Sequence, residues 1–314
     1  MANYQKILRL RPEVRDFVRN RAWIHRGDVL VYQPSVDCPA FSTDRSGFRH
    51  SSFKGKQMSL ADCLRHERYG LVLGASNIYG FGVTGNESAL PSLLAERFEF
   101  PFANLGMPAG NGRNLYSLLM DIFARAPQRP AALVYFSGGD YSSFCKTSLC
   151  DRVFGSPSRQ QVDAAVKERG GNPNAEAQLP ALLAFTSLWT TAIVQACRQR
   201  KIPVVLGHDT TFFEKTQAND LERQSDLGKA MNATQERQFA NHRKFGEAFY
   251  NRRRNVAKKI DVPLAGWGLE NEVGFIDEFH CDREGTRLLA DSVAETLEPL
   301  LQGAASQPEL TATA

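Results

Sequence analysis

From about residue 69 onward, the chain alternates short apolar runs with longer segments whose apolar residues recur every three or four positions. Short apolar runs are typical of strands buried on both faces, and the longer periodicity is typical of helices packed on one side. This alternation predicts an α/β fold, a three-layer sandwich in which helices cover both faces of a five-stranded parallel sheet. The strands are predicted within 69–76, 100–106, 131–139, 202–209 and 261–267, and the helices within 87–98, 112–126, 179–201, 234–260 and 283–301.

The segments outside this alternation predict no second core. Residues 4–20 have the pattern of an amphipathic helix, 26–53 of short strands joined by turns, and 59–66 of a short helix. We therefore expect an N-terminal decoration over 1–68 and a main domain over 69–302, with an irregular stretch from about 139 to 178. Residues 303–314 are small and polar, which predicts a disordered tail.

Composition excludes several classes of function. With 314 residues, 42% hydrophobic and 23% charged, the chain has ordinary globular composition. A net charge of +4 is too dilute for a nucleic-acid-binding stripe, and we interpret the basic run 252–254 as a solvated helix face. The N-terminus lacks a signal-peptide core, and no stretch approaches the roughly 18–20 consecutive apolar residues of a membrane span.

The six cysteines favour a reducing compartment. They form no C-x-x-C pair, so we expect free thiols and a cytoplasmic location. Cys145 and Cys150 would need further ligands to bind zinc, and no suitably spaced histidine pair accompanies them. We therefore expect no metal and no cofactor.

The first predicted strand ends on a serine. The run 71–80, LVLGASNIYG, breaks from apolar residues into Gly74, Ala75, Ser76 and Asn77. These residue types are usual in turns, so the serine is either an ordinary turn residue or a nucleophile displayed at the end of a buried strand. Because Ile78 occupies the second position after Ser76, this is not the G-x-S-x-G elbow of the α/β-hydrolase fold.

A base and its partner are available near the end of the chain. Asp277 and His280 lie three positions apart, just before the last predicted helix. The carboxylate can accept the imidazole Nδ1–H and leave Nε2 to face a serine. The alternative is a surface loop in which Asp282 caps the final helix. The backbone N–H groups of Ser76 and Gly106 are candidate oxyanion donors, and Asn111 and Asn114 could add side-chain donors.

Residues 80–85 form a G-x-G-x-x-G sequence, the pattern of a dinucleotide-binding loop. That function requires the first glycine at the strand end, but the strand already ends at Gly74, and the next strand offers no acidic residue for a ribose. We interpret these glycines as loop flexibility and expect no nucleotide site.

In the order of these signals, residues 69–300 resemble the SGNH (GDSL-type) hydrolases. Their first block is matched by Gly74-Ala75-Ser76, their second by Gly106, and their last, Asp-x-x-His, by Asp277 to His280 with Gly285 following. The resemblance implies a flavodoxin-like sandwich with Ser76 as nucleophile, His280 as base and Asp277 as its partner. It also implies Ser76 and Gly106 as backbone oxyanion donors.

One block departs from that pattern. Where the family has Gly-x-Asn-Asp after the third strand, this chain has residues 137–140, with Gly139 in place of the asparagine donor and Asp140 after it. An ionised aspartate would repel an oxyanion. Replacement donors are Asn111, Asn77 or an N–H of Gly138 or Gly139.

The function predicted from these residues is a metal-free serine esterase that cleaves an acyl ester, with a small-molecule or glycan ester as its partner. Residues 42–49, STDRSGFR, resemble the leader of bacterial SGNH proteins linked to polysaccharide assembly, which suggests an acetyl ester on a carbohydrate. Two alternatives stay open: an O-acyltransferase that uses the same triad, and a non-catalytic protein that binds a glycan or partner. We expect Asn77, Asp140 and His208 on the substrate side. Two other interpretations of His208 and Asp209 stay open. They are either a histidine base with its carboxylate partner, competing with His280 and Asp277, or a plain polar turn. The oligomeric state is not predicted.

Overall fold

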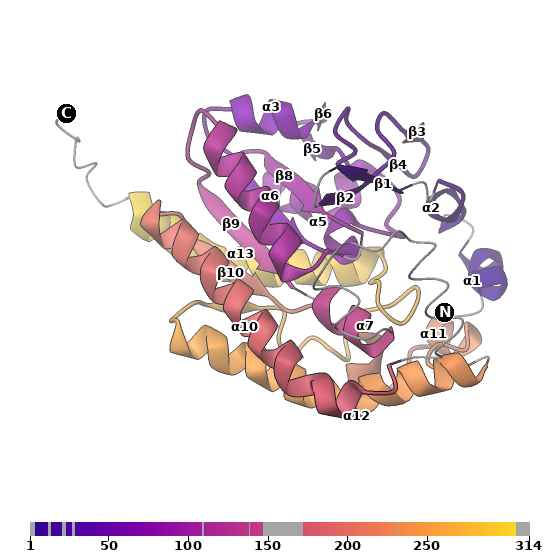
Figure 1. Ribbon diagram of the computed structural model, residues 1–314. Helices are drawn as coiled ribbons and strands as arrows, with labels where there is room; N and C mark the ends of the chain where they lie inside the picture. Colours follow the sequence, from indigo (N-terminus) through magenta and orange to yellow (C-terminus); the bar gives the residue numbers. More distant parts are fainter. Residues whose placement is uncertain are drawn as a thin grey trace.

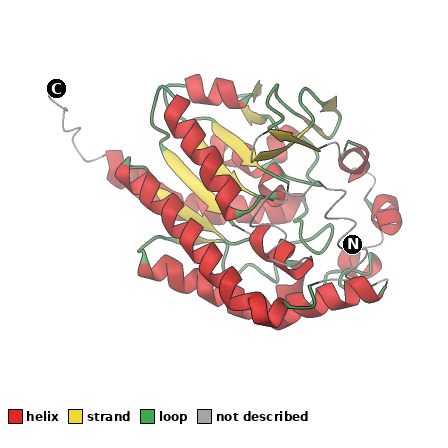
Figure 2. Ribbon diagram, in the orientation of Figure 1, coloured by secondary structure: helices red, strands yellow, loops and turns green. Residues whose placement is uncertain are grey.

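The structure is a computed structural model, and it describes residues 4–11, 14–20, 23–26, 29–108, 110–137, 139–146, 172–230 and 232–305. Its centre is one five-stranded sheet with helices on both sides (Figures 1 and 2). The strands are β7 (Gly70–Gly74), β8 (Phe102–Gly106), β9 (Ala132–Phe136), β10 (Val204–Gly207) and β11 (Leu264–Ala265).

All pairings within this sheet are parallel, and the spatial order is β11-β10-β9-β7-β8. Counted along the chain, this is the 2-1-3-4-5 order of flavodoxin-like sheets. The order reverses between β7 and β9, because the chain leaves β7 towards one edge for β8 and returns to the other side for β9. The predicted α/β sandwich is confirmed, and ligands in such sheets bind at this switch point.

Successive strand residues pack into two different cores, because side chains alternate across a strand. On β7, Val72 joins one core while Leu71 and Leu73 join the other, and all three are fully buried. The first core lies under α5 (Leu90–Phe98) and α13 (Arg283–Ala305). The second lies under α6 (Gly112–Arg125), α10 (Ala175–Gln199) and the end of α12 (Ala233–Lys259). Burial on both faces explains why the strands appear as continuous apolar runs.

Helix α10 is, by length and composition, apolar enough to cross a membrane, and it is the one such helix among the described residues. It packs against α6, α7 and α12 in the structure (Figure 1). Core helices pass the same test, so this feature alone indicates no membrane span.

The N-terminal region shares the core of the sheet domain. Ile7, Phe17 and Phe41 pack in the same buried cluster as Tyr79 and Phe81, which follow β7. The described buried residues of this region thus belong to the clusters of the sheet domain, and a domain division at residue 68 stays a prediction. Its strands form small two-stranded sheets. They are β1 (Trp23–Arg26), β2 (Val29–Tyr32), β3 (Asp37–Cys38), β4 (Phe41–Ser42), β5 (Ser51–Phe53) and β6 (Lys56–Met58), followed by helix α3 (Leu60–Arg65).

Three element predictions were wrong in their bounds. The single helix expected over 4–20 is two helices, α1 (Tyr4–Leu10) and α2 (Arg15–Arg19), because Pro12 between them has no amide hydrogen to continue a helix. The stretch expected to be irregular begins with helix α7 (Gly139–Lys146), and α10 starts at Ala175. Helix α13 runs to Ala305, into the expected tail, and 306–314 lie outside the described residues. The remaining elements are α4 (Ser76–Tyr79), α11 (Asp220–Gln224) and 3-10 turns at Asn86–Ser88 and Phe212–Glu214.

Gly106, at the end of β8, is held against the backbone of α4. A Cβ atom there would lie 2.0 Å from the Tyr79 nitrogen, so a side chain must push α4 away from the sheet. We expect Gly106→Ala to lower the free energy of unfolding by about 1–3 kcal/mol, measured by urea denaturation. Gly303→Ala is the control, because a Cβ at Gly303 meets nothing within 4 Å. Equal stability of the two variants would contradict the close packing.

Candidate active site

Ser76 lies where the strand order reverses. Strand β7 ends at Gly74, Ala75 is extended (φ −88°, ψ −152°), and Ser76 is the first residue of α4. Gly74 permits this tight turn, because a Cβ there would lie 2.5 Å from Ile78 Cγ1. The serine is thus displayed at the carboxyl edge of the sheet, between a buried strand and a short helix.

Folding brings Ser76, His280 and Asp277 into one hydrogen-bonded chain. His280 Nε2 lies 2.8 Å from Ser76 Oγ, and His280 Nδ1 lies 2.8 Å from each Asp277 carboxylate oxygen. The predicted juxtaposition is therefore present in the structure. In this arrangement the carboxylate holds Nδ1 protonated, so that Nε2 is available to accept the serine proton.

Backbone hydrogen bonds hold the loop that carries the acid and the base. Asp277 Oδ1 accepts the N–H groups of Phe279 and His280, both at 2.9 Å. The Ile276 N–H donates to the His280 carbonyl, which closes the loop behind the imidazole. Asp282 accepts the Gly285 N–H at the start of α13, as the alternative interpretation of this loop predicted. Capping the helix and facing the serine are therefore compatible uses of one loop.

The charge of Asp277 is stabilised where it lies. The residue is 4% exposed, and burial by itself raises the pKa of its carboxyl group. The charge of His280 and the hydrogen bonds from its ring and from the two backbone N–H groups outweigh that effect and hold the pKa of Asp277 below its ordinary value. An ionised carboxylate is what an imidazolium formed at His280 requires.

Phe81 covers the imidazole, a contact that the sequence analysis missed. Its ring centroid lies 4.6 Å from that of His280, and the side chain of His280 is 14% exposed. The ring therefore excludes water from one side of the base. Phe81 is the second residue of the glycine-rich stretch 80–85, and its contact with a histidine 199 positions later leaves no signal in the sequence.

The predicted oxyanion donors are only partly available. The Gly106 N–H donates to Asn104 Oδ1 at 3.0 Å, so it is occupied in this structure, contrary to the prediction that it is free for an oxyanion. Gly139, the first residue of α7, is instead the glycine that lies next to the serine turn. A Cβ on Gly139 would lie 1.9 Å from the Gly110 carbonyl oxygen and 3.3 Å from Ala75 Cβ. The sequence contains several glycines near these strand ends, and only the fold identifies Gly139 as the one that borders Ala75.

The donor roles of Gly139 and Asn111 stay predictions, and the structure shows which of their groups are already engaged. Gly139 is the first residue of α7, where a backbone N–H has no intrahelical partner. Asn111 caps α6, and its side-chain oxygen accepts the Asn114 N–H at 3.0 Å. Only the amino group of Asn111 is left as a donor, and its predicted role stays untested. Gly138 lies outside the described residues.

The Asp140 carboxylate is hydrogen-bonded within the protein. It is 5% exposed, and its carboxylate accepts the Gly112 N–H at 3.0 Å and the Thr186 hydroxyl at 3.4 Å. These bonds tie the start of α7 to the start of α6 and to α10. The substrate contact of Asp140 stays a prediction, while its carboxylate is bonded to groups of the protein itself.

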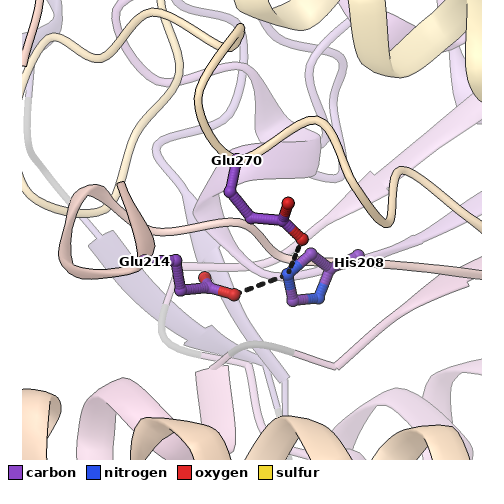
Figure 3. Close-up of side chains that lie close together, drawn as sticks. All are labelled: His208, Glu214 and Glu270. Atoms are coloured by element: carbon purple, nitrogen blue, oxygen red, sulfur yellow. Dashed lines mark hydrogen bonds and ion pairs between the residues drawn. The ribbon is translucent and has the colours of Figure 1, made fainter. Parts of the chain in front are cut away.

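His208 and Asp209 do not form a histidine–carboxylate pair that competes with His280 and Asp277. The His208 ring is fully buried, and its Nε2 lies 2.7 Å from a Glu214 oxygen (Figure 3). Asp209 instead lies 3.8 Å from the Arg253 guanidinium. His208 therefore pairs with a carboxylate six positions later, and the imidazole within hydrogen-bond distance of Ser76 is that of His280.

His208, Glu214 and Glu270 form one group of potential metal ligands within the described part of the chain. One ligand atom from each lies within 4.8 Å of the others, and Glu270 Oε1 is 3.8 Å from His208 Nε2 (Figure 3). Nε2 already pairs with Glu214, so a divalent cation would have to displace that contact. Of the two cysteines considered as zinc ligands, Cys145 is a buried free thiol. Cys150 lies outside the described residues.

Asn77 and His208 line a common cavity beside the nucleophile turn. The Asn77 side-chain oxygen is buried without a hydrogen-bond partner among the described residues. Ser76 and His280 do not line the cavity, which is mainly apolar, and the substrate-side roles of Asn77 and His208 stay predictions. The lining includes Asn77, Ile78, Phe81, Phe136, His208 and Cys281.

The Asp277 carboxylate should matter for rate far more than for substrate affinity. We expect Asp277→Asn to lower kcat on an ester substrate by about 10³–10⁴, because an amide neither fixes the required tautomer nor stabilises an imidazolium. KM should change little. The exposed Asp121→Asn serves as the control, and an unchanged kcat in Asp277→Asn would show that the carboxylate does not support the base.

The same carboxylate predicts a pH dependence of stability. Because the folded-state pKa of Asp277 lies below its ordinary value of 3.8, its contribution is present above about pH 4 and is lost as the pH falls through the folded-state pKa. Urea midpoints of wild type and Asp277→Asn should therefore differ at pH 6 and converge towards pH 3. A difference that stays constant with pH would contradict this origin.

No family model matches the chain, and no curated protein matches it either. Solved structures do align. A carbohydrate acetylesterase family member from Sinorhizobium meliloti is 16% identical, with a TM-score of 0.47 over 75% of this chain and 99% of that one. The aryl esterase of M. smegmatis is 13% identical, with a TM-score of 0.47 over 74% and 99%. A putative G-D-S-L family lipolytic protein from Desulfitobacterium hafniense is 14% identical, with a TM-score of 0.41 over 73% and 99%.

Independently of these alignments, the strand order and the Ser76–His280–Asp277 chain are those that the resemblance to the SGNH hydrolases implies.

Proposed function

We propose that this protein is a serine esterase that cleaves an acyl ester. The observation that carries the proposal is the unbroken hydrogen-bonded chain from Ser76 Oγ through the His280 ring to Asp277, with each contact at 2.8 Å. A nucleophile, a base within hydrogen-bond reach and a third group that orients the base are the parts that acyl transfer through serine needs.

In the proposed reaction, Ser76 Oγ attacks the ester carbonyl carbon as His280 Nε2 takes the serine proton. The imidazolium is stabilised by Asp277 and returns the proton to the departing alcohol oxygen, which leaves the acyl group on Ser76. Water then attacks this acyl-enzyme, with His280 accepting its proton, and the acid is released as the proton returns to Ser76. Each half of the reaction balances without any other reactant.

The developing oxyanion requires backbone donors in place of the missing asparagine. We propose the N–H groups of Ser76 and Gly139, which begin α4 and α7 and so lack intrahelical partners. These two helices start after β7 and β9, the adjacent strands on either side of the switch point. Gly139 supports this assignment because the absence of a Cβ lets its backbone approach the neighbouring loop closely.

For the substrate we propose an acetyl ester of a carbohydrate. The support is the resemblance of residues 42–49 to proteins of polysaccharide assembly. On that ground, an acetylated glycan is the substrate to test first. Transfer of the acyl group to a sugar hydroxyl would use the same three side chains. A product assay with an acetyl donor, with and without an acceptor glycan, separates hydrolysis from transfer.

A cytoplasmic location stays a prediction. The described cysteines, at positions 38, 63, 145, 197 and 281, are all free thiols, which supports a reducing compartment. Cell fractionation tests it.

Reaction with a fluorophosphonate probe tests the nucleophile. We expect the probe to label the wild-type protein and Ser88→Ala, and not Ser76→Ala, because only an activated serine attacks phosphorus at a useful rate. Ser88 is a suitable control because it is 3% exposed and lies in the same region of the chain. If the wild type is not labelled, the non-catalytic binding function is favoured instead.

A further inference from the structure

One arginine is enclosed beside the nucleophile turn. Arg49 precedes β5 and is 1% exposed. Its guanidinium presents five N–H donors in a planar fork. Each acceptor is a neutral oxygen: Nε donates to Asn86 Oδ1 (2.9 Å), Nη1 to the carbonyls of Tyr79 (3.1 Å) and Gly80 (2.7 Å), and Nη2 to those of Ala40 (3.4 Å), Val83 (2.8 Å) and Gly85 (2.8 Å).

Burial of this cation is costly, and the protein retains it. Desolvation lowers the pKa of Arg49 to about 10, partly opposed by charges such as that of Glu87, so the guanidinium remains charged at neutral pH. Hydrogen bonds to a charged donor are stronger than those between neutral groups. The ring of carbonyls is therefore held by one multidentate cation.

The glycines of the G-x-G-x-x-G sequence shape this ring. Gly80, Gly82 and Gly85 all have positive φ, at +79°, +83° and +85°, which other residues rarely adopt. The loop curls around the guanidinium, and a Cβ on Gly80 would lie 2.7 Å from Arg49 Nη1. The motif that resembles a phosphate-binding loop thus surrounds an arginine of the same chain.

The loop that Arg49 holds contacts both halves of the triad. The N–H groups of Gly80 and Phe81 donate to the Ser76 carbonyl, each at 3.1 Å. The Phe81 ring packs on His280. Gly82 lies against Ile276, the residue before Asp277, where a Cβ would come within 1.8 Å of the Ile276 side chain. Displacement of this loop would move the nucleophile and the base together.

We propose that Arg49 is a positioning residue: its guanidinium, bound to the carbonyls of the 79–85 loop, sets the distance between Ser76 Oγ and His280 Nε2. The proposal rests on the proposed function of these two side chains. It also gives the N-terminal region a role in the reaction, because Arg49 reaches the site from outside the sheet domain. Arg49 touches no reacting atom.

Arg49→Lys isolates the geometry from the charge. Lysine keeps the positive charge but presents one ammonium instead of a fork, so it cannot reach the separate carbonyls at once. A misplacement of about 1 Å at a reacting pair costs on the order of 10²-fold in rate. We expect Arg49→Lys to lower kcat and the rate of fluorophosphonate labelling by about 10²-fold, with KM changed less than about threefold.

A matched control separates positioning from general stability. Leu119→Ala removes a fully buried side chain from α6 in the core on the other sheet face, so it destabilises the fold without touching the 79–85 loop. Both variants are compared at a temperature where circular dichroism shows them folded. Wild-type labelling of Leu119→Ala and slow labelling of Arg49→Lys are the expected results.

Chemical rescue gives a second readout. Guanidinium chloride at about 10–50 mM should accelerate labelling of Arg49→Ala, whereas urea, which is planar and uncharged, should not at the same concentration. An equal response to the two solutes, or labelling of Arg49→Lys at the wild-type rate, would overturn the proposal. Failure of the wild type itself to react would overturn the proposed function instead, so the two failures are distinguishable.

Discussion

The hydrogen bond between His280 Nε2 and Ser76 Oγ joins residues 204 positions apart, and the rest of the site is arranged around it. It can form because the loop after the first strand of the sheet and the loop before the last helix meet at one sheet edge. The parallel order places every strand end on that edge, and the reversal between β7 and β9 opens the position that Ser76 occupies. Each half of the pair is then fixed locally, the serine by the turn into α4 and the histidine by Asp277 and two backbone amides.

Residues 79–85 connect those two local arrangements. The same short loop caps α4, supports the His280 ring through Phe81 and packs against the residue before Asp277. Its three glycines allow backbone conformations that gather carbonyl oxygens, and the buried guanidinium of Arg49 satisfies them. A glycine-rich sequence therefore does not by itself identify an anion-binding site. A loop that binds an anion points its N–H groups at the ligand, whereas this loop points its carbonyl oxygens at a cation.

The oxyanion side shows how polar residues near a site can be committed to the fold. Asp140 ties α6 and α10 to the start of α7, Asn111 caps α6, and the Gly106 amide is occupied by Asn104. These bonds satisfy buried backbone groups that would otherwise destabilise the folded state. The first amides of α4 and α7, which follow the adjacent strands β7 and β9, are the donors proposed in place of an asparagine.

The sequence by itself determined the layered α/β fold, because apolar runs buried on both faces have a distinctive pattern. It also predicted that Asp277 and His280 would lie at Ser76, since an Asp-x-x-His loop before the last helix was combined with a serine at a strand end. It also located Ser76, since a strand end is readable from the point where the apolar run stops. Tertiary structure alone decided the partners of Asp140 and His208, the occupied amide of Gly106 and the enclosure of Arg49 by the 79–85 loop. Those contacts join segments distant in the chain or depend on the direction in which a single N–H or carbonyl points, and neither property is encoded in the spacing of residue types.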